Sequence, residues 1–307
     1  MMSKGLDIPV FDFDSVLASV SPAAAIERVR DGFACFARGE WSMPSKVYLQ
    51  SPPYGDFRAM PALGNDVAIL KWVTSFPDNP KEGRPVVYGT VLASDARTGE
   101  PRALIDGRAV TALRTGAAAA VASAALARKD ARTAGIVGCG LHGRWAGLCL
   151  KASGFADGVC ADSDPSAAER LASELGWRTG TTTEALGCDV VTLVTPGHEP
   201  VVTATDLRPG VHINALGADG PGKAEMDIDA VVACEVFCDE WNQAGHGGEL
   251  TGAVEAGRLE REDVQDLGTV LIGAATGRSS DSAVTLFDST GLAIQDLAIV
   301  LAVLEDT

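Results

Sequence analysis

The chain has 307 residues, which is enough for one large domain or two ordinary ones. With 46% apolar and 21% charged residues it has the composition of an ordinary globular protein. The formal charge of −16 argues against non-specific binding to nucleic acid or to an anionic membrane surface, and any anionic substrate would need a local basic cluster.

Cysteine and histidine are distributed in a way that does not suggest a metal site. Seven cysteines are scattered without the spacing of a zinc motif, and four histidines lie far apart in the sequence. Reduced thiols in a cytoplasmic protein are the simplest account of this pattern. No apolar run approaches the roughly 18 residues that a bilayer requires, so we expect no membrane-spanning segment.

The first part of the chain is predicted to consist mainly of strands. Ser21 and Pro22 open a helix with a capping hydroxyl and a proline in the first turn, and Gly39 ends it. Strands are then predicted at 42–49, 57–63, 67–75, 86–94 and 101–105. So many strands with one helix before them indicate a separate, partly antiparallel domain.

Two basic residues in this part are unusual for their positions. Lys71 lies in an apolar strand, where it is costly to bury unless a charge or ligand meets it. The alternative is an edge lysine that extends to water. Arg114 is predicted in the first turn of an alanine-rich helix that ends at Ala127, where the helix dipole disfavours a cation and an anionic ligand would offset the repulsion.

A dinucleotide-binding pattern follows this helix. A strand over 133–137 leads into Gly138, Gly140 and Gly143 and then into a second helix. Gly138 permits a tight turn, Gly140 lets the backbone approach a pyrophosphate, and Gly143 permits close packing of the helix on the sheet. Leu141 and His142 begin that helix, whose unpaired N–H groups attract phosphate. The alternative is a glycine-rich turn with no nucleotide.

An acidic residue follows at the distance that a ribose requires. Asp162 comes after the next predicted strand and would accept hydrogen bonds from the ribose hydroxyls. Its charge would repel a 2′-phosphate, so we predict NAD rather than NADP as the cofactor. Asp164 is a rival for the same role, because predicted strand ends are uncertain by a few residues.

From residue 133 onward, predicted strands and helices alternate. Further strands are expected at 189–195, 211–216, 231–238 and 285–288, with helices near 249–257 and 262–272. Ligands of open α/β sheets lie beyond the carboxyl ends of the strands, so Thr195 and Asp219 are predicted in the cleft. Asp219 has a simpler alternative as a turn-forming residue in a glycine-rich loop. Ser289 opens a terminal helix that is apolar enough to be buried.

These elements predict an α/β fold with two domains. A Rossmann NAD-binding domain is expected over 117–288. A smaller α+β domain for substrate binding and dimerisation is expected over 1–116, completed by the C-terminal helix in 289–307.

At this level of detail the chain resembles the ornithine cyclodeaminase/μ-crystallin family, which includes archaeal-type alanine dehydrogenases and cyclic ketimine reductases. The matching stretches follow one another in the family's order along nearly the whole chain. They are Leu70-Lys71-Trp72-Val73 with Phe76-Pro77, Thr111-Ala112-Leu113-Arg114-Thr115, Gly138-Cys139-Gly140, residues 214–225, and residues 287–296.

The resemblance implies a lysine, an arginine and an aspartate around the substrate, at Lys71, Arg114 and Asp219. Arg114 is suited to a bidentate grip on an α-carboxylate. Lys71 would transfer a proton or polarise an imine or a bound water, and Asp219 would balance or exchange the proton on the substrate nitrogen. Lys46 stands where family members commonly have an arginine; it can supply charge to a carboxylate but not paired hydrogen bonds.

The implied function is that of an NAD(H)-dependent oxidoreductase which interconverts a small L-α-amino acid and its imine or keto acid, as alanine dehydrogenases and ketimine reductases do. A cyclodeaminase that converts ornithine or lysine into a cyclic amino acid with release of ammonia is the alternative, and a non-catalytic small-molecule binder is a third. The family also implies a homodimer joined through the sheet of the first domain. The candidate cofactor contacts are Thr115, Gly138, Gly140, Leu141, His142, Gly143, Asp162, Thr195 and Ser289.

Overall fold

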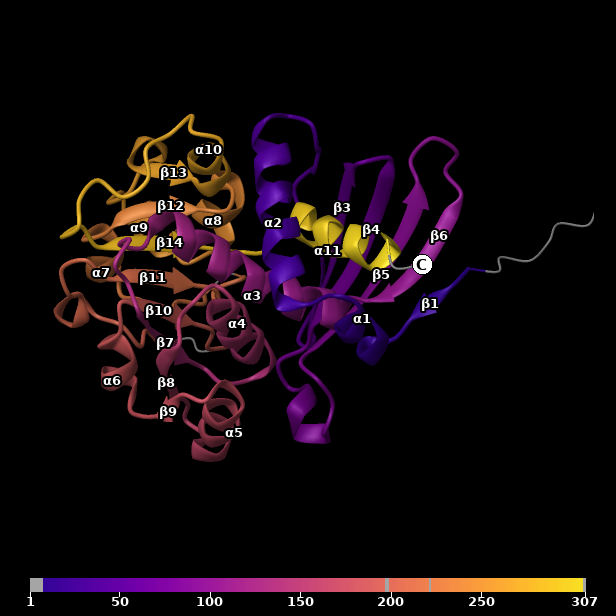
Figure 1. Cartoon of the computed structure of the whole chain (residues 1–307). Coiled ribbons are helices and arrows are strands. Elements are labelled where there is room, and N and C mark those ends of the chain that lie inside the picture. Colours follow the sequence, from indigo (N-terminus) through magenta and orange to yellow (C-terminus); the bar gives the residue numbers. More distant parts are fainter. Residues whose placement is uncertain (1–7, 197–198, 221, 306–307) are drawn as a thin grey trace, which may run out of the picture. The chain divides into compact units, whose positions relative to one another are not determined.

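The computed structural model describes residues 8–196, 199–220 and 222–305. It divides into two compact units (Figure 1). Unit 1 comprises Met1–Arg114 and Ala293–Thr307, and unit 2 comprises Thr115–Leu292. The α/β fold class predicted from the sequence, a Rossmann domain with a second α+β domain, is confirmed.

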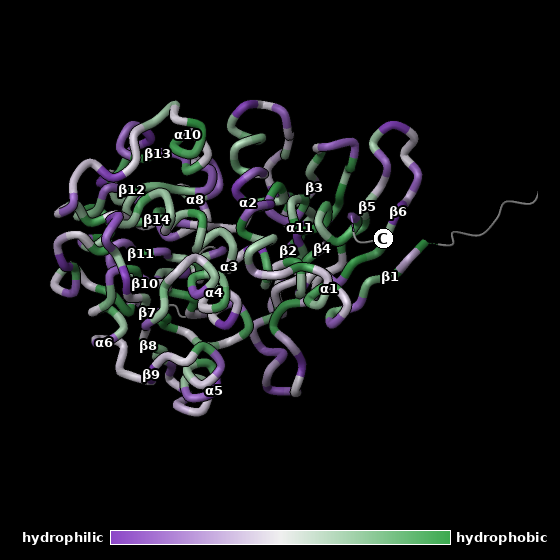
Figure 2. The backbone as a smooth tube through the Cα atoms, viewed as in Figure 1, coloured by the Kyte–Doolittle hydropathy of each residue, from purple (hydrophilic) through white to green (hydrophobic). Residues whose placement is uncertain are grey.

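Unit 1 is built on a mixed six-stranded sheet in the order β1-β6-β5-β4-β3-β2. Only the β1–β6 pair is parallel. The strands are β1 (Val10–Phe11), β2 (Val47–Ser51), β3 (Gly55–Gly64), β4 (Val67–Ser75), β5 (Val87–Asp95) and β6 (Pro101–Asp106). Figure 2 shows these strands as mainly hydrophobic and the turns between β3 and β4 and between β5 and β6 as hydrophilic.

Helices cover one face of this sheet. They are α1 (Phe13–Ser19), α2 (Pro22–Ala37) and α11 (Ala293–Glu305), while the short η1 (Asn79–Glu82) lies in the exposed loop between β4 and β5. As predicted, Ser21 caps α2 with its hydroxyl. The helix α11 packs alongside α2 and on β3 and β4, and its middle is fully buried (Figure 1). The terminal segment therefore belongs to unit 1, as its apolar sequence predicted.

The long helix α3 (Gly107–Leu126) starts earlier than the sequence predicted. Asp106 at the end of β6 accepts hydrogen bonds from the backbone N–H groups of Arg108 (2.8 Å) and Ala109 (3.0 Å), so the strand leads directly into the helix. The placement of Arg114 in a first turn was therefore wrong, and the dipole argument does not apply to it. By length and composition α3 could also span a membrane, contrary to our expectation, but 83% of its apolar window is buried inside the protein.

Unit 2 is built on an all-parallel eight-stranded sheet in the order β13-β12-β14-β11-β10-β7-β8-β9. Its chain order reverses between β7 and β10, which is the arrangement of a dinucleotide-binding fold. The strands are β7 (Thr133–Val137), β8 (Asp157–Ala161), β9 (Arg178–Thr179), β10 (Val190–Leu193), β11 (His212–Ala215), β12 (Glu235–Cys238), β13 (Val264–Asp266) and β14 (Thr285–Asp288). Strands β7 and β14 have the predicted limits.

Short helices connect these strands. They are α4 (Leu141–Ala152), α5 (Pro165–Leu175), α6 (Thr182–Leu186), η2 (Ala204–Asp206), α7 (Ile228–Val232), α8 (Trp241–Gly247), α9 (Thr251–Glu255), η3 (Arg261–Asp263) and α10 (Leu267–Leu271). The strand predicted over 231–238 was wrong in its first half, because Asp227 caps α7 there. The helix predicted over 262–272 was also partly wrong, since Val264–Asp266 pairs with β12.

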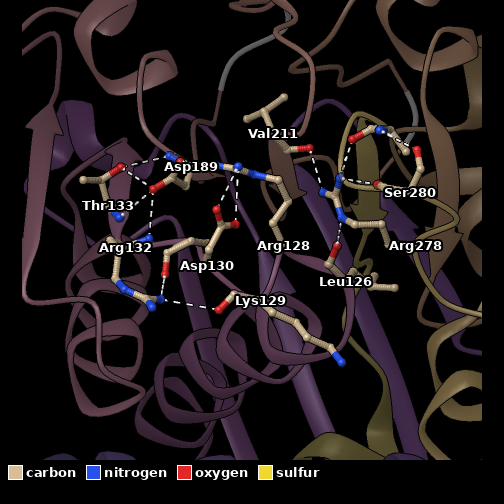
Figure 3. A network of polar contacts seen from close by, with 12 residues as sticks. Leu126, Arg128, Lys129, Asp130, Arg132, Thr133, Asp189, Val211, Arg278 and Ser280 are labelled. Carbon is tan, nitrogen blue, oxygen red and sulfur yellow. Dashed lines mark hydrogen bonds and ion pairs between the residues drawn. The ribbon is translucent and has the colours of Figure 1, made fainter.

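A polar network closes the N-terminal edge of this sheet (Figure 3). Asp189 accepts hydrogen bonds from the backbone N–H groups of Arg132 (2.8 Å) and Thr133 (3.0 Å) and from the side chain of Arg128 (2.7 Å). Arg278 donates to the carbonyl oxygens of Leu126 (2.7 Å) and Val211 (3.1 Å). The network thus joins the end of α3 to the starts of β7, β10, β11 and β14.

Candidate active site

The glycine-rich turn after β7 has the geometry that a pyrophosphate requires. Gly138 has a φ of +98°, and a Cβ there would meet the carbonyl oxygen of Val194 at 2.6 Å. A Cβ on Gly143 would meet the carbonyl oxygen of Gly138 at 1.8 Å, so α4 packs directly on the turn. At Gly140, by contrast, no atom of the described residues lies within 4 Å of a Cβ position. The backbone faces open space where a phosphate would lie.

The N-terminus of α4 supports the same interpretation. Its N-cap is Gly140, which has no side chain to accept a hydrogen bond from the first turn. Leu141 is 39% exposed and His142 is half-buried at the start of the helix. The first turn of α4 therefore lacks a side-chain cap, and the positive end of its helix dipole favours an anion. These residues fit the diphosphate of a dinucleotide.

The structure also distinguishes the two candidate acids after β8. The Asp162 carboxylate accepts hydrogen bonds from the backbone N–H groups of Cys139 (2.5 Å) and Asp164 (2.8 Å), so it lies beside the glycine-rich turn. Asp164 instead caps α5, with its carboxylate bound to the N–H and hydroxyl of Ser166. This geometry favours Asp162 over Asp164 for the ribose.

The other three cofactor candidates differ in how their side chains are used. Thr115 is buried, and its hydroxyl has no hydrogen-bond partner among the described residues. Such a hydroxyl is available to a ligand. Thr195 donates its N–H (2.6 Å) and hydroxyl (2.8 Å) to Glu225, and Ser289 donates its hydroxyl to Asp239 (3.0 Å). These two side chains therefore hold the loops themselves in place.

In unit 1 the unusual lysine of β4 is buried and paired. Lys71 is 1% exposed, and its ammonium donates to Asp296 Oδ1 (2.8 Å) and to the hydroxyl of Thr111 (2.6 Å). The Thr111 hydroxyl in turn donates to the carbonyl oxygen of Gly107 (2.6 Å). Burial lowers the pKa of Lys71 to about 8, against the opposing effect of the Asp296 charge. The edge-lysine alternative was wrong.

Arg114 approaches the same oxygen of this carboxylate. Its Nε is 3.6 Å from Asp296 Oδ1, and its guanidinium also donates to Gln295 Oε1 (3.4 Å). Asp296 is fully buried, and its second oxygen, Oδ2, has no hydrogen-bond partner among the described residues. An ammonium has three donors and Lys71 has two acceptors here, so the cluster has capacity to bind a further polar group.

Two residues of this cluster, Arg58 and Asp296, were not predicted from the sequence. Arg58 on β3 is only 8% exposed, and its positive charge contributes to the low pKa of Lys71. The alternation of β3 and β4 places Arg58, Met60 and Lys71 on one face. Lys46 immediately precedes β2 and is half-buried. Alternation along β3 and the charge within the apolar α11 were the signals that could have identified Arg58 and Asp296.

Asp219 lies in unit 2, in the loop that follows β11. Its carboxylate forms an ion pair with Lys223 at 2.6 Å, and both side chains are partly exposed (37% and 23%). Asp219 is thus accessible beyond the carboxyl end of a central strand, where ligands of this fold bind. Among the described residues, no group of three or more His, Cys, Asp or Glu side chains could hold a metal ion.

A doubly wound parallel sheet, an open glycine-rich turn and a carboxylate beside that turn are the features of a Rossmann-type dinucleotide-binding enzyme. The sequence matches the Ornithine cyclodeaminase/mu-crystallin family over residues 12–307. The chain belongs to this family, as the sequence motifs predicted.

Individual relatives show the range of the family. The chain is 40% identical to the alanine dehydrogenase of Archaeoglobus fulgidus, over 95% of this chain and 93% of the relative. It is 34% identical to the ornithine cyclodeaminase of Agrobacterium fabrum, over 80% of this chain and 70% of the relative. A solved archaeal alanine dehydrogenase dimer with bound NAD superposes with a TM-score of 0.93 at 38% identity, over 97% of this chain and 95% of that one. The protein is an enzyme with NAD as its cofactor, as predicted.

Proposed function

We propose that the protein interconverts a small L-α-amino acid and its imine or keto acid with NAD(H). The observation that carries this proposal is the buried basic cluster of unit 1, in which Lys71 and Arg114 share the carboxylate of Asp296. Arg58 lies on the same face and is paired with Asp56. Three cations with two anions leave a net positive charge in a buried place. An α-carboxylate would neutralise it, which answers the need of an acidic chain for a local anion site.

Each residue has a role that its geometry supports. Arg114 offers a planar fork to the substrate carboxylate, with Arg58 and Lys46 supplying further positive charge. Lys71 retains a donor beyond its two acceptors and, with a pKa near 8, can give up a proton near neutral pH. Asp219 would balance the charge on the substrate nitrogen. When bound, the nicotinamide accepts or supplies the hydride at the substrate carbon.

For the cofactor we propose the turn at Gly138, Gly140 and Gly143 as the diphosphate site, together with the N-terminus of α4 at Leu141 and His142. Asp162 would bind the ribose. Thr115 would contact the cofactor through its buried hydroxyl, while Thr195 and Ser289 would line the site through backbone that their own side chains fix.

A cyclodeaminase is the second candidate, supported by the 34% identity to an ornithine cyclodeaminase. Its reaction removes a hydride and later returns it, so there is no net redox change. The two candidates separate in one assay. Oxidation of NADH, followed by absorbance at 340 nm, with pyruvate plus ammonia or with a cyclic imino acid supports the dehydrogenase or reductase. Release of ammonia from ornithine or lysine without net change in absorbance supports the cyclodeaminase. Absence of nicotinamide nucleotide binding in calorimetry would contradict both.

We further propose a homodimer joined through the uncovered face of the unit 1 sheet. Large apolar side chains on that face are 41–63% exposed, namely Val47, Leu49, Leu63, Leu70 and Trp72. Contiguous exposed apolar surface of this kind marks an interaction site, and the similar archaeal structure is described as a dimer. Light scattering of the purified protein should give twice the chain mass; a monomer would contradict the proposal. The seven free cysteines support a cytoplasmic location.

A further inference from the structure

Two buried glutamates of unit 2 have no place in the chemistry described above. Glu225, near the end of the loop after β11, is 0% exposed, and Glu249, before α9, is 3% exposed. One oxygen of Glu225 accepts the N–H (2.6 Å) and the hydroxyl (2.8 Å) of Thr195, and the other accepts the N–H of Gly217 (2.7 Å). A single carboxylate therefore joins the loop after β10 to the loop after β11.

Glu249 supports this arrangement from behind. Its carboxylate accepts the backbone N–H of Glu225 (2.9 and 3.0 Å) and that of Met226 (2.7 Å). The backbone from which the Glu225 side chain projects is thus fixed by a second buried acid. The groups that donate to these two carboxylates are backbone N–H groups and one hydroxyl. The carboxylates therefore hold the loops in place.

The two loops touch at a glycine. A Cβ on Gly217 would lie 2.1 Å from the carbonyl oxygen of Thr195 and 2.6 Å from Glu225 Oε1. Only glycine fits there, so the two loops are in close contact at this point. Asp219 lies between Gly217 and Glu225, so both ends of its segment are bound to the same carboxylate.

We infer that Glu225 is a positioning residue: its ionised carboxylate fixes the segment that carries Asp219 against the loop after β10. The inference rests on the proposed role of Asp219. An ionised carboxylate accepts all three hydrogen bonds, whereas a protonated one carries an O–H and loses acceptor capacity toward these donors. Protonation of Glu225 should therefore loosen the segment and misplace Asp219.

The pKa values of Glu225 and Glu249 lie close to neutral pH. Burial raises the pKa of Glu225 to about 7, against the hydrogen bonds from Thr195 and Gly217. Burial also raises the pKa of Glu249 to about 7, and the Glu225 charge adds to the effect. Other charged groups lie nearby. Asp219 and Lys223 form an ion pair on the same loop as Glu225. The charge of Glu249 also acts on the buried Asp288, as does the charge of the buried Asp239. Because Glu225 becomes protonated as the pH drops below about 7, turnover should fall over the same range.

The test is Glu225→Gln, which keeps the shape of the side chain, cannot ionise, and directs an amide N–H₂ toward loop donors. Because a small misplacement can cost about 100-fold, we expect kcat to fall about 10- to 100-fold. The dissociation constant of NADH should rise by a smaller factor than kcat falls, because Thr195 is one of several proposed cofactor contacts. The acidic limb of the pH profile should be displaced or absent. Asp189→Asn is the matched control, since Asp189 also accepts several loop donors but at the opposite edge of the sheet; it should keep the wild-type pH profile.

A Glu225→Gln variant with the wild-type kcat and acidic limb would overturn the inference. If that variant does not fold, hydrogen exchange of the wild-type enzyme decides instead. The amides of Thr195 and Gly217 should be better protected at pH 8 than at pH 6, after correction for intrinsic rates, and equal protection would overturn the inference. Full activity of Asp219→Ala would refute the proposed role of Asp219 itself, and neither measurement on Glu225 depends on that variant.

Discussion

The two edges of the parallel sheet in unit 2 carry different kinds of polar group. At the N-terminal edge, Arg278 and Asp189 bind backbone and side-chain groups of several neighbouring segments (Figure 3). At the C-terminal edge, Glu225 and Glu249 are buried with raised pKa values, and the turn at Gly140 faces open space. At the N-terminal edge these charged side chains bind other groups of the protein, and at the C-terminal edge the glycine-rich turn retains capacity for a ligand.

The direction of the chain explains this difference. In a parallel α/β sheet, each helix starts near the carboxyl end of the preceding strand and ends near the start of the next. Helix N-termini, with free N–H groups, therefore collect at the C-terminal edge and attract anions. Helix C-termini collect at the N-terminal edge, where their carbonyl oxygens need donors. Arg278 donates to the carbonyl oxygen of Leu126, the last residue of α3.

The largest expected effect is a loss of turnover, without loss of stability, from a substitution at the C-terminal edge. Asp219→Ala should lower kcat by about 10³-fold, within the range for loss of a general acid or base. Because Asp219 is partly exposed and its ion pair with Lys223 lies within one loop, the melting temperature should hardly change. NAD affinity, measured by calorimetry, should also be retained. A fully active variant would remove Asp219 from the mechanism.

The opposite result is expected at the N-terminal edge. Arg278→Met should lower the free energy of unfolding by about 3 kcal/mol, because it leaves the carbonyl oxygens of Leu126 and Val211 without their donor. Urea unfolding measures this change. The kcat of the folded variant should equal that of the wild type, and a large loss of kcat would show that the two edges are not functionally separate.

The C-terminal edge was also the better predicted of the two from sequence. Gly138, Gly140 and Gly143 are required by local backbone geometry, and a local requirement is visible in a local pattern. The limits of β7 were predicted for the same reason. By contrast, the network around Arg278 joins residues that are far apart in the chain, so no spacing rule identifies it.

The missed residues of the site have the same explanation. Asp296 meets Lys71 across a separation of 225 residues, and only the packing of α11 on β4 brings them together. The start of α3 was misplaced because Asp106, a strand residue, also serves as its cap. Burial of Glu225 could not be predicted either, since its partners Thr195 and Gly217 lie on two different loops.

A smaller effect should sharpen the assignment of the cofactor site. Asp162→Ala removes a charged acceptor for the ribose hydroxyls, a hydrogen bond worth about 1.5–3 kcal/mol, so NAD affinity should fall about 10- to 100-fold. The discrimination against NADP should relax at the same time, because the repulsive charge is gone. Asp164→Ala is the control; it should affect the start of α5 but not cofactor preference. An unchanged preference in Asp162→Ala would show that another residue selects NAD.

Unit 1 allows a similar comparison between a carboxylate of the proposed site, Asp296, and one that caps a helix, Asp106. The Asp296 charge opposes the effect of burial on the pKa of Lys71, so Asp296→Asn should lower that pKa below its value of about 8. The protonated fraction of Lys71 then falls, and the alkaline limb of the pH profile should move to lower pH by about one unit. Asp106→Asn is the control, because it alters a carboxylate that caps α3. An unmoved limb in Asp296→Asn would assign that limb to another group.

The smallest expected effect concerns the pH dependence of the unfolding free energy, which should have opposite signs for buried groups at the two edges. Burial, helped by the charge of Arg278, lowers the pKa of His212 from 6.5 to about 3 at the N-terminal edge. Between these values the unfolded chain binds a proton that the folded protein does not, so this contribution to stability is lost as the pH falls. Glu225 and Glu249 act in the opposite direction: their folded pKa values of about 7 exceed the ordinary 4.5, so their contribution is lost as the pH rises through this range.

Because the wild-type curve contains both contributions, the informative quantity is the difference between proteins. Relative to the wild type, His212→Gln should gain about 1 kcal/mol in unfolding free energy between pH 7 and pH 5.5, on top of a constant loss of its bonds to Thr285 and Asn214. Glu225→Gln should show the opposite slope over the same interval. Urea unfolding at several pH values measures the unfolding free energy of both variants. If the difference from the wild type changed with pH in the same direction for both, the proposed contrast between the two edges of the sheet would be contradicted.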